Sequence, residues 1–270
     1  MISAAHPPDA LHFATSRRAP SLRKGEIHVW SIKLQDAAGL LSDHAVLLSQ
    51  EELRRADSFR FEIDRCRFMA ARGTLRRILA AYTGATPQSV QIATTESGKP
   101  FLAKPPTPLH FNLAHSADRA LIALAAEANL GIDLEDLRHE SRVADLAESI
   151  CSKAERCRLE TLLPPLRNRA LLRLWTAKEA FLKSTGLGLQ VDPVRLEVSH
   201  HVSTGSREPS SIHWLDQPAR SRQYCLYPLP ECEARIGASA ALATTRTGHL
   251  HRIVWIDAAT DRRPTWVDEE

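Results

Sequence analysis

The spacing of apolar positions predicts a mixed order of strands and helices in the first half of the chain. A mostly apolar, β-prone run predicts a strand over residues 27–34. A short helix is predicted over 50–57, because Ser49 and an acidic first turn precede it. From Asp64 to Gly84, apolar side chains recur at steps of three or four and predict a long amphipathic helix. The further strands expected in this half are 90–94, 109–113 and 120–125.

The same kind of pattern begins again near residue 129, which predicts a second unit of similar type. A strand is expected at 131–135, and helices at 142–150 and 168–184. Four further strands are expected at 194–199, 211–215, 224–229 and 236–243. Polar, turn-rich residues predict a hairpin loop over 200–210 and a mobile tail over 260–270.

This order predicts an α+β protein divided into two subdomains. The halves share no obvious sequence identity, so an internal repeat is a hypothesis that rests on element order. The predicted divisions are a flexible N-terminal extension (1–24), an N-terminal subdomain (25–128), a C-terminal subdomain (129–246) and a C-terminal strand or tail (247–270).

Composition narrows the class of protein. The 270 residues are 43% hydrophobic and 25% charged, which is typical of a folded globular chain. No apolar run reaches the roughly 18 residues that a membrane helix needs. The five cysteines form no C-x-x-C pair, which favours a reducing, cytoplasmic compartment. The net charge of +3 is too small for the positive field of a general nucleic-acid binder.

Two carboxylates follow one another on one face of the strand predicted at 131–135. Side chains alternate along a strand, so Ile132 and Leu134 should point inward while Asp133 and Glu135 point outward together. Their mutual repulsion would be relieved by a cation between them, and oxygen ligands suit Mg²⁺. A solvated strand end that leads into a helix is the alternative explanation.

A second acidic and basic pair lies on the helix predicted at 168–184. Glu179 and Lys183 are four residues apart, well round the helix from the apolar stripe that contains Leu174 and Phe181. An exposed ion pair worth about 0.3–0.5 kcal/mol would explain this spacing without any function.

Other short patterns carry weaker signals. The turn-forming Gly98-Lys99-Pro100 would let a ligand approach the backbone, and His115 ends a predicted strand in polar surroundings. Arg65, Arg72 and Arg76 align on the polar face of the helix that starts after Asp64; they would be solvated or bind phosphate oxygens.

Taken in order, these patterns resemble the Sfp-type 4'-phosphopantetheinyl transferases. The motifs are an arginine-rich helix, G-K-P, F-N-x-x-H-S, G-I-D-x-E and W-x-x-K-E-x-x-x-K, and the last two form the hallmark pair. The resemblance covers residues 27–243. It implies a Mg²⁺-dependent, holo-acyl-carrier-protein synthase type of enzyme, which transfers the phosphopantetheine arm of coenzyme A to a serine of an apo acyl or peptidyl carrier protein and releases 3',5'-ADP.

The fold implied by the resemblance is a pseudo-twofold pair of similar α+β subdomains with the active site in the cleft between them. Asp133, Glu135 and Glu179 match the Mg²⁺ carboxylates, and the catalytic set is Glu179 as base with Lys183 and Asp133. The resemblance also implies a monomer that binds neither nucleic acid nor membrane. The residues implied in coenzyme A binding are Arg55, Gly98, Lys99, Pro100, Asn112, His115 and Lys183, with Arg67 and Arg72 as secondary candidates.

The chain departs from this family at Ala114, where relatives commonly have serine. The missing hydroxyl predicts weaker coenzyme A binding, on the order of 1 kcal/mol. Two other functions remain open at this point. One is a basic module for nucleic acid or acidic partners, suggested by the arginines between residues 54 and 77. The other is a different Mg²⁺-dependent phosphotransferase that uses the same acids.

Overall fold

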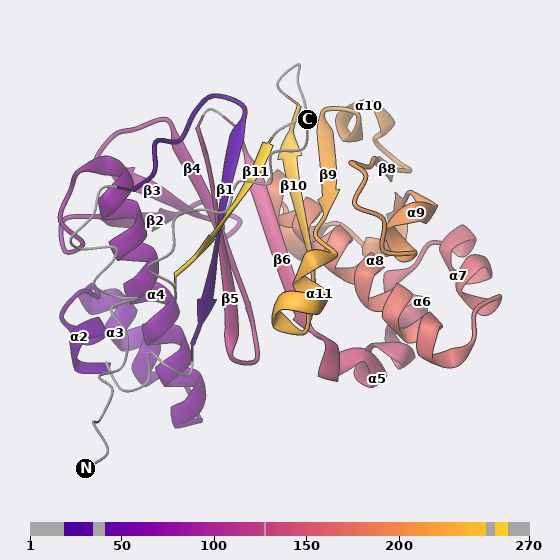
Figure 1. Cartoon of the computed structure of the whole chain (residues 1–270), viewed down its shortest axis with the longest axis horizontal. Helices are drawn as coiled ribbons and strands as arrows, with labels where there is room; N and C mark the ends of the chain where they lie inside the picture. Colours follow the sequence, from indigo (N-terminus) through magenta and orange to yellow (C-terminus); the bar gives the residue numbers. More distant parts are fainter. Residues whose placement is uncertain (1–18, 35–40, 127, 247–251, 259–270) are drawn as a thin grey trace, which may run out of the picture.

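The computed structural model describes residues 19–34, 41–126, 128–246 and 252–258. The predicted N-terminal extension lies outside this range up to residue 18, as do the tail residues 247–251 and 259–270. Figure 1 shows two sheets in the middle of the molecule, with helices on the outer side of each. The mixed α+β class predicted from the sequence is therefore confirmed.

The first sheet has four strands in the order β11-β1-β5-β4. Pairs β1–β5 and β5–β4 are antiparallel, whereas β11 runs parallel to β1. A separate hairpin of β2 and β3 lies beside it. The strands are β1 (Glu26–Lys33), β2 (Gln91–Thr94), β3 (Pro100–Lys104), β4 (Leu109–Ser116), β5 (Arg119–Ala126) and β11 (Arg252–Asp257). The helices of this half are α2 (Leu41–Ala45), α3 (Gln50–Asp57) and α4 (Glu62–Thr83).

The second sheet has three antiparallel strands in the order β6-β10-β9, and β7 pairs with β8 in a small hairpin. The strands are β6 (Leu130–Asp136), β7 (Leu196–Val198), β8 (Ile212–Trp214), β9 (Tyr224–Pro228) and β10 (Ala238–Thr245). The α-helices are α5 (Glu140–Val143), α6 (Ala147–Ile150), α7 (Lys153–Glu160), α8 (Pro164–Thr185), α9 (His200–Ser203), α10 (Pro218–Ser221) and α11 (Glu231–Ile236). Short 3-10 helices cover Leu137–His139, Ala144–Leu146, Gly188–Gln190 and Pro193–Arg195.

Three apolar clusters hold these layers together. One packs α4 against the first sheet and includes Leu75 and Ile122. A second joins the two sheets through side chains such as Leu121 and Ile132. A third packs α8, with Phe181 at its centre, against the second sheet. Because both faces of each sheet are covered, burial of apolar surface fixes the position of one half against the other.

The two halves repeat the same order of elements. The first runs β1, α4, the β2–β3 hairpin, β4 and β5, and its strands lie in the order β1-β5-β4. The second runs β6, α8, the β7–β8 hairpin, β9 and β10, and its strands lie in the order β6-β10-β9. Each half also has one 22-residue helix that ends at a left-handed glycine, Gly84 in α4 and Gly186 in α8.

Several sequence predictions need correction at this level. The long helix begins at Glu62 rather than after Asp64, and its N-cap residue Phe61 makes no side-chain cap. The predicted turn around residue 100 is followed by the short strand β3, and the predicted loop at 200–210 begins with α9. The helices α2, α7 and α11 were not predicted. By contrast, α3 spans the predicted residues, with Ser49 in a capping box.

The predicted solvated arginine face of α4 is also wrong in part. The carboxylate of Glu52 accepts from Arg72 Nε and Arg76 Nε, both at 2.7 Å. Arg76 is buried and also donates to the carbonyls of Pro87 and Val90. The acidic turn of α3 therefore covers this part of the arginine face and occupies the guanidinium groups.

A histidine is buried where α2 packs on α4. His44 is fully buried, and a Cβ at Gly73 would lie only 2.3 Å from its Nδ1. Neither ring nitrogen has a hydrogen-bond partner within the described ranges. Burial, together with the charge of Arg77, lowers the pKa of His44 to about 4.

Candidate active site

Strand β6 and helix α8 approach each other closely at Gly131. A Cβ at this position would lie 2.2 Å from the carbonyl oxygen of Ala180 and 2.3 Å from the amide nitrogen of Ser184. Only glycine allows this approach. The contact brings the next outward position of β6, Asp133, against the last turns of α8.

Asp133 and Lys183 meet across this contact. Lys183 Nζ donates to Asp133 Oδ1 at 2.6 Å, whereas Asp133 Oδ2 is buried without a hydrogen-bond partner in the described part of the chain. Burial raises the pKa of Asp133 to about 6, with a contribution from Glu135 and against the opposing charge of Lys183. The two predicted outward acids share a face, but α8 covers that face instead of solvent.

Glu179 is the second acid with an unsatisfied oxygen. It is half-buried on α8, and its Oε1 is enclosed without a hydrogen-bond partner among the described residues. Burial, and then the charge of Asp133, raise the pKa of Glu179 to about 7. The expected ion pair between Glu179 and Lys183 is absent from the described ion pairs, in which Lys183 binds Asp133.

Glu135 differs from the other two acids, because both of its oxygens have partners. Ser116 Oγ donates to Oε2 at 3.1 Å, and Trp175 Nε1 donates to Oε1 at 3.3 Å. His139 Nδ1 lies 3.8 Å from Oε2. Neutral donors and one histidine thus surround Glu135, and its carboxylate is held in one orientation.

Whether the three acids suit a metal ion depends on the oxygen atoms that each of them leaves without a partner. No group of three or more His, Cys, Asp or Glu side chains is already arranged around a metal position in the described ranges. Asp133 and Glu179 nevertheless each keep one buried oxygen without a partner, and the charge of Asp133 raises the pKa of Glu179. Oxygen donors of this kind fit a Mg²⁺ ion, which would satisfy them and relieve their repulsion.

His115 lies at the end of β4, near the same cluster. Its side chain is exposed on one side. Partial burial, followed by the charges of Lys183 and Arg67, lowers the pKa of His115. Arg67 itself lies 3.5 Å from Asp64. These cationic and polar groups border the acid cluster on the side of the first half.

Ala114 does not face this cluster. Its side chain is 3% exposed and belongs to the apolar layer between the sheets, with Ile132 and Leu134. Side chains alternate along β4, so position 114 faces β6 while position 115 faces the opposite way. A serine hydroxyl here would therefore lie against β6, and the predicted hydroxyl contact to coenzyme A does not fit this geometry.

Lys99 joins the two halves beside the acid cluster. Its Nζ donates to the carbonyl oxygens of Leu130 and Ser184, at 3.0 and 3.1 Å. Burial lowers the pKa of Lys99 to about 8. Gly98 forms the predicted tight turn, with φ of +83°.

A cavity of about 390 Å³ opens beside Lys99 and is lined from both halves. Lys99, Pro100 and His110 contribute from the first half, and Leu130 and Ser184 from the second. It lies at the beginning of β6 and the end of α8, adjacent to the acid cluster in sequence on both elements. The residues predicted to bind Mg²⁺ and coenzyme A therefore lie in two neighbouring places, the acid cluster and the cavity beside Lys99.

The remaining predicted ligand residues lie apart from this cavity or are engaged in the fold. Asn112 Oδ1 accepts from the amide of Ile132 at 2.9 Å. Arg55 is exposed on α3, with its guanidinium 5.7 Å from the Phe68 ring centroid. Arg72 binds Glu52, as described above. The coenzyme A roles of these residues stay predictions.

Lys178, the neighbour of Glu179, lies in a different environment. It is fully buried and donates to Glu155 Oε2 at 2.6 Å and to the carbonyls of Ile150 and Pro193. Sequence reasoning assigned it no role, although it falls on the apolar stripe of the helix, four residues after Leu174. A lysine at such a position signals a buried cation with dedicated partners.

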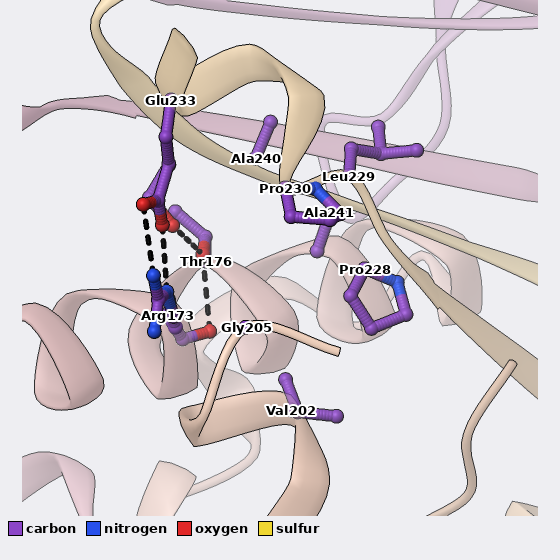
Figure 2. Close-up of a pocket in the computed structure, with 11 residues that line it drawn as sticks. Arg173, Thr176, Val202, Gly205, Pro228, Leu229, Pro230, Glu233, Ala240 and Ala241 are labelled. Atoms are coloured by element: carbon purple, nitrogen blue, oxygen red, sulfur yellow. Dashed lines mark hydrogen bonds and ion pairs between the residues drawn. The ribbon is translucent and has the colours of Figure 1, made fainter. Parts of the chain in front are cut away.

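A third face of α8 carries an ion pair that closes a small hollow. Figure 2 shows Arg173 pointing at Glu233 of α11, with Thr176 beside them. The guanidinium binds both carboxylate oxygens, at 2.6 and 2.8 Å. The hollow beside this pair has a volume of only about 10 Å³, room for a single water. This face is therefore structural, and the unsatisfied acids lie on the β6 side.

Comparison with known proteins places this arrangement in a family. Residues 129–229 match the 4'-phosphopantetheinyl transferase superfamily, and residues 37–129 match the N-terminal model of 4'-phosphopantetheinyl transferases. The two matches meet at residue 129. Within the described residues, no helix is long and apolar enough to cross a bilayer.

Individual relatives agree with the family models. The chain is 40% identical to the 4'-phosphopantetheinyl transferase HetI of Nostoc over 171 residues, covering 63% of this chain and 72% of the relative. It is 30% identical to a phosphopantetheinyl transferase of Thraustochytrium over 180 residues (60% and 62%) and 32% identical to AcpT of Salmonella typhi over 150 residues (56% and 69%). These matches do not support the basic-module alternative or the other phosphotransferase. The chain belongs to the 4'-phosphopantetheinyl transferase family.

Proposed function

We propose that this chain transfers the 4'-phosphopantetheine arm of coenzyme A to a serine hydroxyl of an apo carrier protein. The family match supports the reaction. The observation that carries the assignment of the site is the pair of buried, unpartnered carboxylate oxygens on Asp133 and Glu179 beside Lys183. A cluster of this kind is stabilised when a cation and a phosphate bind to it.

Asp133, Glu135 and Glu179 are the proposed Mg²⁺ ligands. A bound Mg²⁺ would polarise the pyrophosphate of coenzyme A and neutralise charge on the leaving phosphate. Lys183 is half-buried and bonded to Asp133, so its ammonium is held beside the same position. It is suited to stabilise negative charge that develops on the phosphate oxygens.

Glu179 is the proposed base for the carrier serine. A carboxylate beside a bound cation stays ionised, so Glu179 can accept the serine proton, either directly or through a water. The serine oxygen then forms a bond to the phosphorus that carries the pantetheine arm. The bond from this phosphorus to the bridging pyrophosphate oxygen breaks, and 3',5'-ADP leaves with the electron pair.

The cavity beside Lys99 is the proposed place of the nucleotide. Its volume of about 390 Å³ suits a part of a cofactor, and it is lined from both halves. Gly98 lies in the tight turn before β3 and Pro100 begins that strand, with Lys99 between them, and their main-chain groups are the proposed contacts. His115 and Arg67, at the other border of the acid cluster, are the proposed contacts for further phosphate oxygens. Asn112 and Arg55 are weaker candidates.

The finer assignments are parts of the same proposal. The repeated element order supports a pseudo-twofold relation between subdomains 25–128 and 129–246, with the active site in the cleft between them. We assign the chain to the Sfp-type subfamily and to the holo-acyl-carrier-protein synthase type of activity on its motifs. Acyl and peptidyl carriers, a cytoplasmic location and a monomeric state, without nucleic acid or membrane as partners, complete the proposal.

The test is intact-mass spectrometry of apo carrier domains incubated with the protein, coenzyme A and Mg²⁺. We expect a mass gain of one phosphopantetheine that requires the carrier serine and the metal. The Glu179→Gln variant and a chelated sample serve as controls, and circular dichroism confirms that the variant is folded.

The outcomes separate this proposal from its alternatives. No mass gain on acyl, peptidyl or polyketide carriers, from a folded protein that binds coenzyme A, would contradict carrier modification. Release of inorganic phosphate without carrier modification would indicate a different phosphotransferase. Equal activity of Glu179→Gln and the parent protein would contradict the assigned site while leaving the family membership in place.

A further inference from the structure

A seam of side chains joins β4 to the free edge of β6. The strands belong to different sheets, and β6 pairs with β10 on its other side. Asn112 Oδ1 accepts from the amide of Ile132 at 2.9 Å, and Ser116 Oγ accepts from the amide of Asp136 at 3.0 Å. Alternate amides of a strand point to the same edge, so these side chains replace the missing neighbouring strand.

The seam brackets the acidic positions of β6. Its two hydrogen bonds are four residues apart on both strands, and Asp133 and Glu135 lie between Ile132 and Asp136. Midway between Asn112 and Ser116 on β4 lies Ala114, whose side chain cannot form a hydrogen bond. We therefore expect a change in either hydrogen bond of the seam to alter the positions of Asp133 and Glu135.

Ser116 differs from Asn112 because its hydroxyl has a second partner. A hydroxyl offers one proton and accepts through its lone pairs. Since Ser116 Oγ accepts from the Asp136 amide, its proton is free to be donated to Glu135 Oε2, at 3.1 Å. Ser116 is also 8% exposed, so water competes little for this proton.

Glu135 is held from the opposite side by Trp175. The indole Nε1 donates to Oε1 at 3.3 Å, from a helix that belongs to the second half. Two neutral donors from two different elements thus fix both oxygens of one carboxylate. They orient the carboxylate without supplying the positive charge that a metal would have to displace.

We propose that Ser116 is a positioning residue that orients Glu135 for metal binding, with Trp175 as its partner on the other oxygen. This inference rests on the proposed function for the identity of the metal site, but it concerns the affinity of that site rather than transfer. The Ser116 hydroxyl makes two hydrogen bonds whose effects can be distinguished by mutation. The bond from the Asp136 amide joins β4 to β6, and the bond to Glu135 orients that carboxylate.

The experiment measures Mn²⁺ affinity by electron paramagnetic resonance, on the full chain with coenzyme A and without a carrier. Ser116→Ala removes both bonds of the hydroxyl. Trp175→Phe removes a bond to Glu135 and leaves the seam intact. Ser116→Thr keeps a hydroxyl in place. Ser203→Ala is the matched control, because Ser203 is equally buried and donates only to the carbonyl of His200, within α9.

We expect Ser116→Ala and Trp175→Phe each to weaken Mn²⁺ binding about tenfold, in the range seen when groups that orient metal ligands are removed. Ser116→Thr should restore parental affinity, and Ser203→Ala should not change it. Urea unfolding should show that Ser116→Ala lowers stability more than Trp175→Phe, because only the first variant leaves the Asp136 amide unpaired.

Three results would overturn the inference. The first is parental Mn²⁺ affinity in Ser116→Ala, and the second is equal weakening in Ser116→Thr. The third is a loss in Ser116→Ala with none in Trp175→Phe, which would mean that only the seam matters. If the expected Mn²⁺ pattern appears but no carrier is modified, the positioning role stands and the proposed function fails.

Discussion

Helix α8 contributes Lys178 to one cluster of charged side chains and Lys183, five residues later, to another. The two clusters differ in how many of their polar atoms have hydrogen-bond partners. Around Lys178, every partner is satisfied: its ammonium has a carboxylate and two carbonyls, and Glu155 also accepts from the amides of Ser152 and Val198. Around Lys183, one ammonium faces two acids, and Asp133 and Glu179 each keep an unpartnered buried oxygen.

This difference separates a structural cluster from a functional one. A satisfied buried pair holds its elements together and has no capacity left for a ligand. An incomplete cluster is unfavourable in isolation, and natural proteins retain such clusters where binding completes them. Burial of a carboxylate does not by itself distinguish the two, because both Glu155 and Asp133 are buried. The number of unpartnered oxygens does.

The largest difference between the clusters should follow from Glu179→Gln, which keeps the shape of the incomplete cluster and removes the proposed base. We expect carrier modification to fall about 10³- to 10⁴-fold, because the proposed base and the proposed metal ligand are lost together. Stability should be unchanged or higher, since a repelling buried charge disappears. Rates from intact-mass spectrometry and urea unfolding check the two halves of this expectation; a large loss of stability would contradict it.

The converse test is Lys178→Met, in the complete cluster. Glu155 would then keep a buried charge without its cation, and we expect a loss of about 3–5 kcal/mol in the free energy of unfolding. Urea denaturation measures it. A loss below about 1 kcal/mol would show that the main-chain amides alone satisfy Glu155, and that the cluster is not what holds α6, α7 and α8 together.

Lys183→Met is the matched variant at the incomplete cluster. Its side chain is 30% exposed, but Asp133 would remain buried without its cation, so we expect a loss of stability that is smaller than in Lys178→Met. Carrier modification should fall about 10²-fold, because the donor proposed to stabilise the developing phosphate charge is removed. Equal stability losses in the two lysine variants would remove the distinction between the clusters.

The last and weakest effect concerns His44, which lies outside both clusters. We expect it to make the free energy of unfolding depend on pH. The neutral ring is favoured in the folded protein, with a pKa of about 4 against 6.5 when unfolded. Its contribution is therefore complete above pH 6.5 and decreases as the pH falls toward 4. Between pH 7 and 5.5 we expect the parent to lose about 1 kcal/mol more than His44→Leu, measured by urea unfolding at each pH. Parallel pH profiles would contradict this assignment.

Much of the fold was predictable because local signals agree with the tertiary structure. The capping box at Ser49 places α3, and the left-handed glycines Gly84 and Gly186 end both long helices. The alternation at β6 placed Asp133 and Glu135 on one face, which the structure confirms. The α+β class followed from the order of these signals along the chain.

The environment of charged side chains could not be predicted from the sequence, because it depends on which elements pack against each other. Arg76 follows a polar stripe, yet Glu52 of α3 covers it. Lys183 is four residues from Glu179, yet the close approach at Gly131 brings Asp133 nearer. Lys178 was the missed signal: a charge on an apolar stripe needs a buried partner, but the chain gives no local indication that Glu155 is that partner.

Strand β11 has a consequence for how the chain is made. It lies parallel to β1 at the edge of the first sheet, although more than two hundred residues separate the two strands. When the first half of the chain has emerged from the ribosome, the β1 edge of its sheet is therefore still open. That edge is covered only after residues 252–257 have been made, and in the interval it is available to pair with other nascent chains.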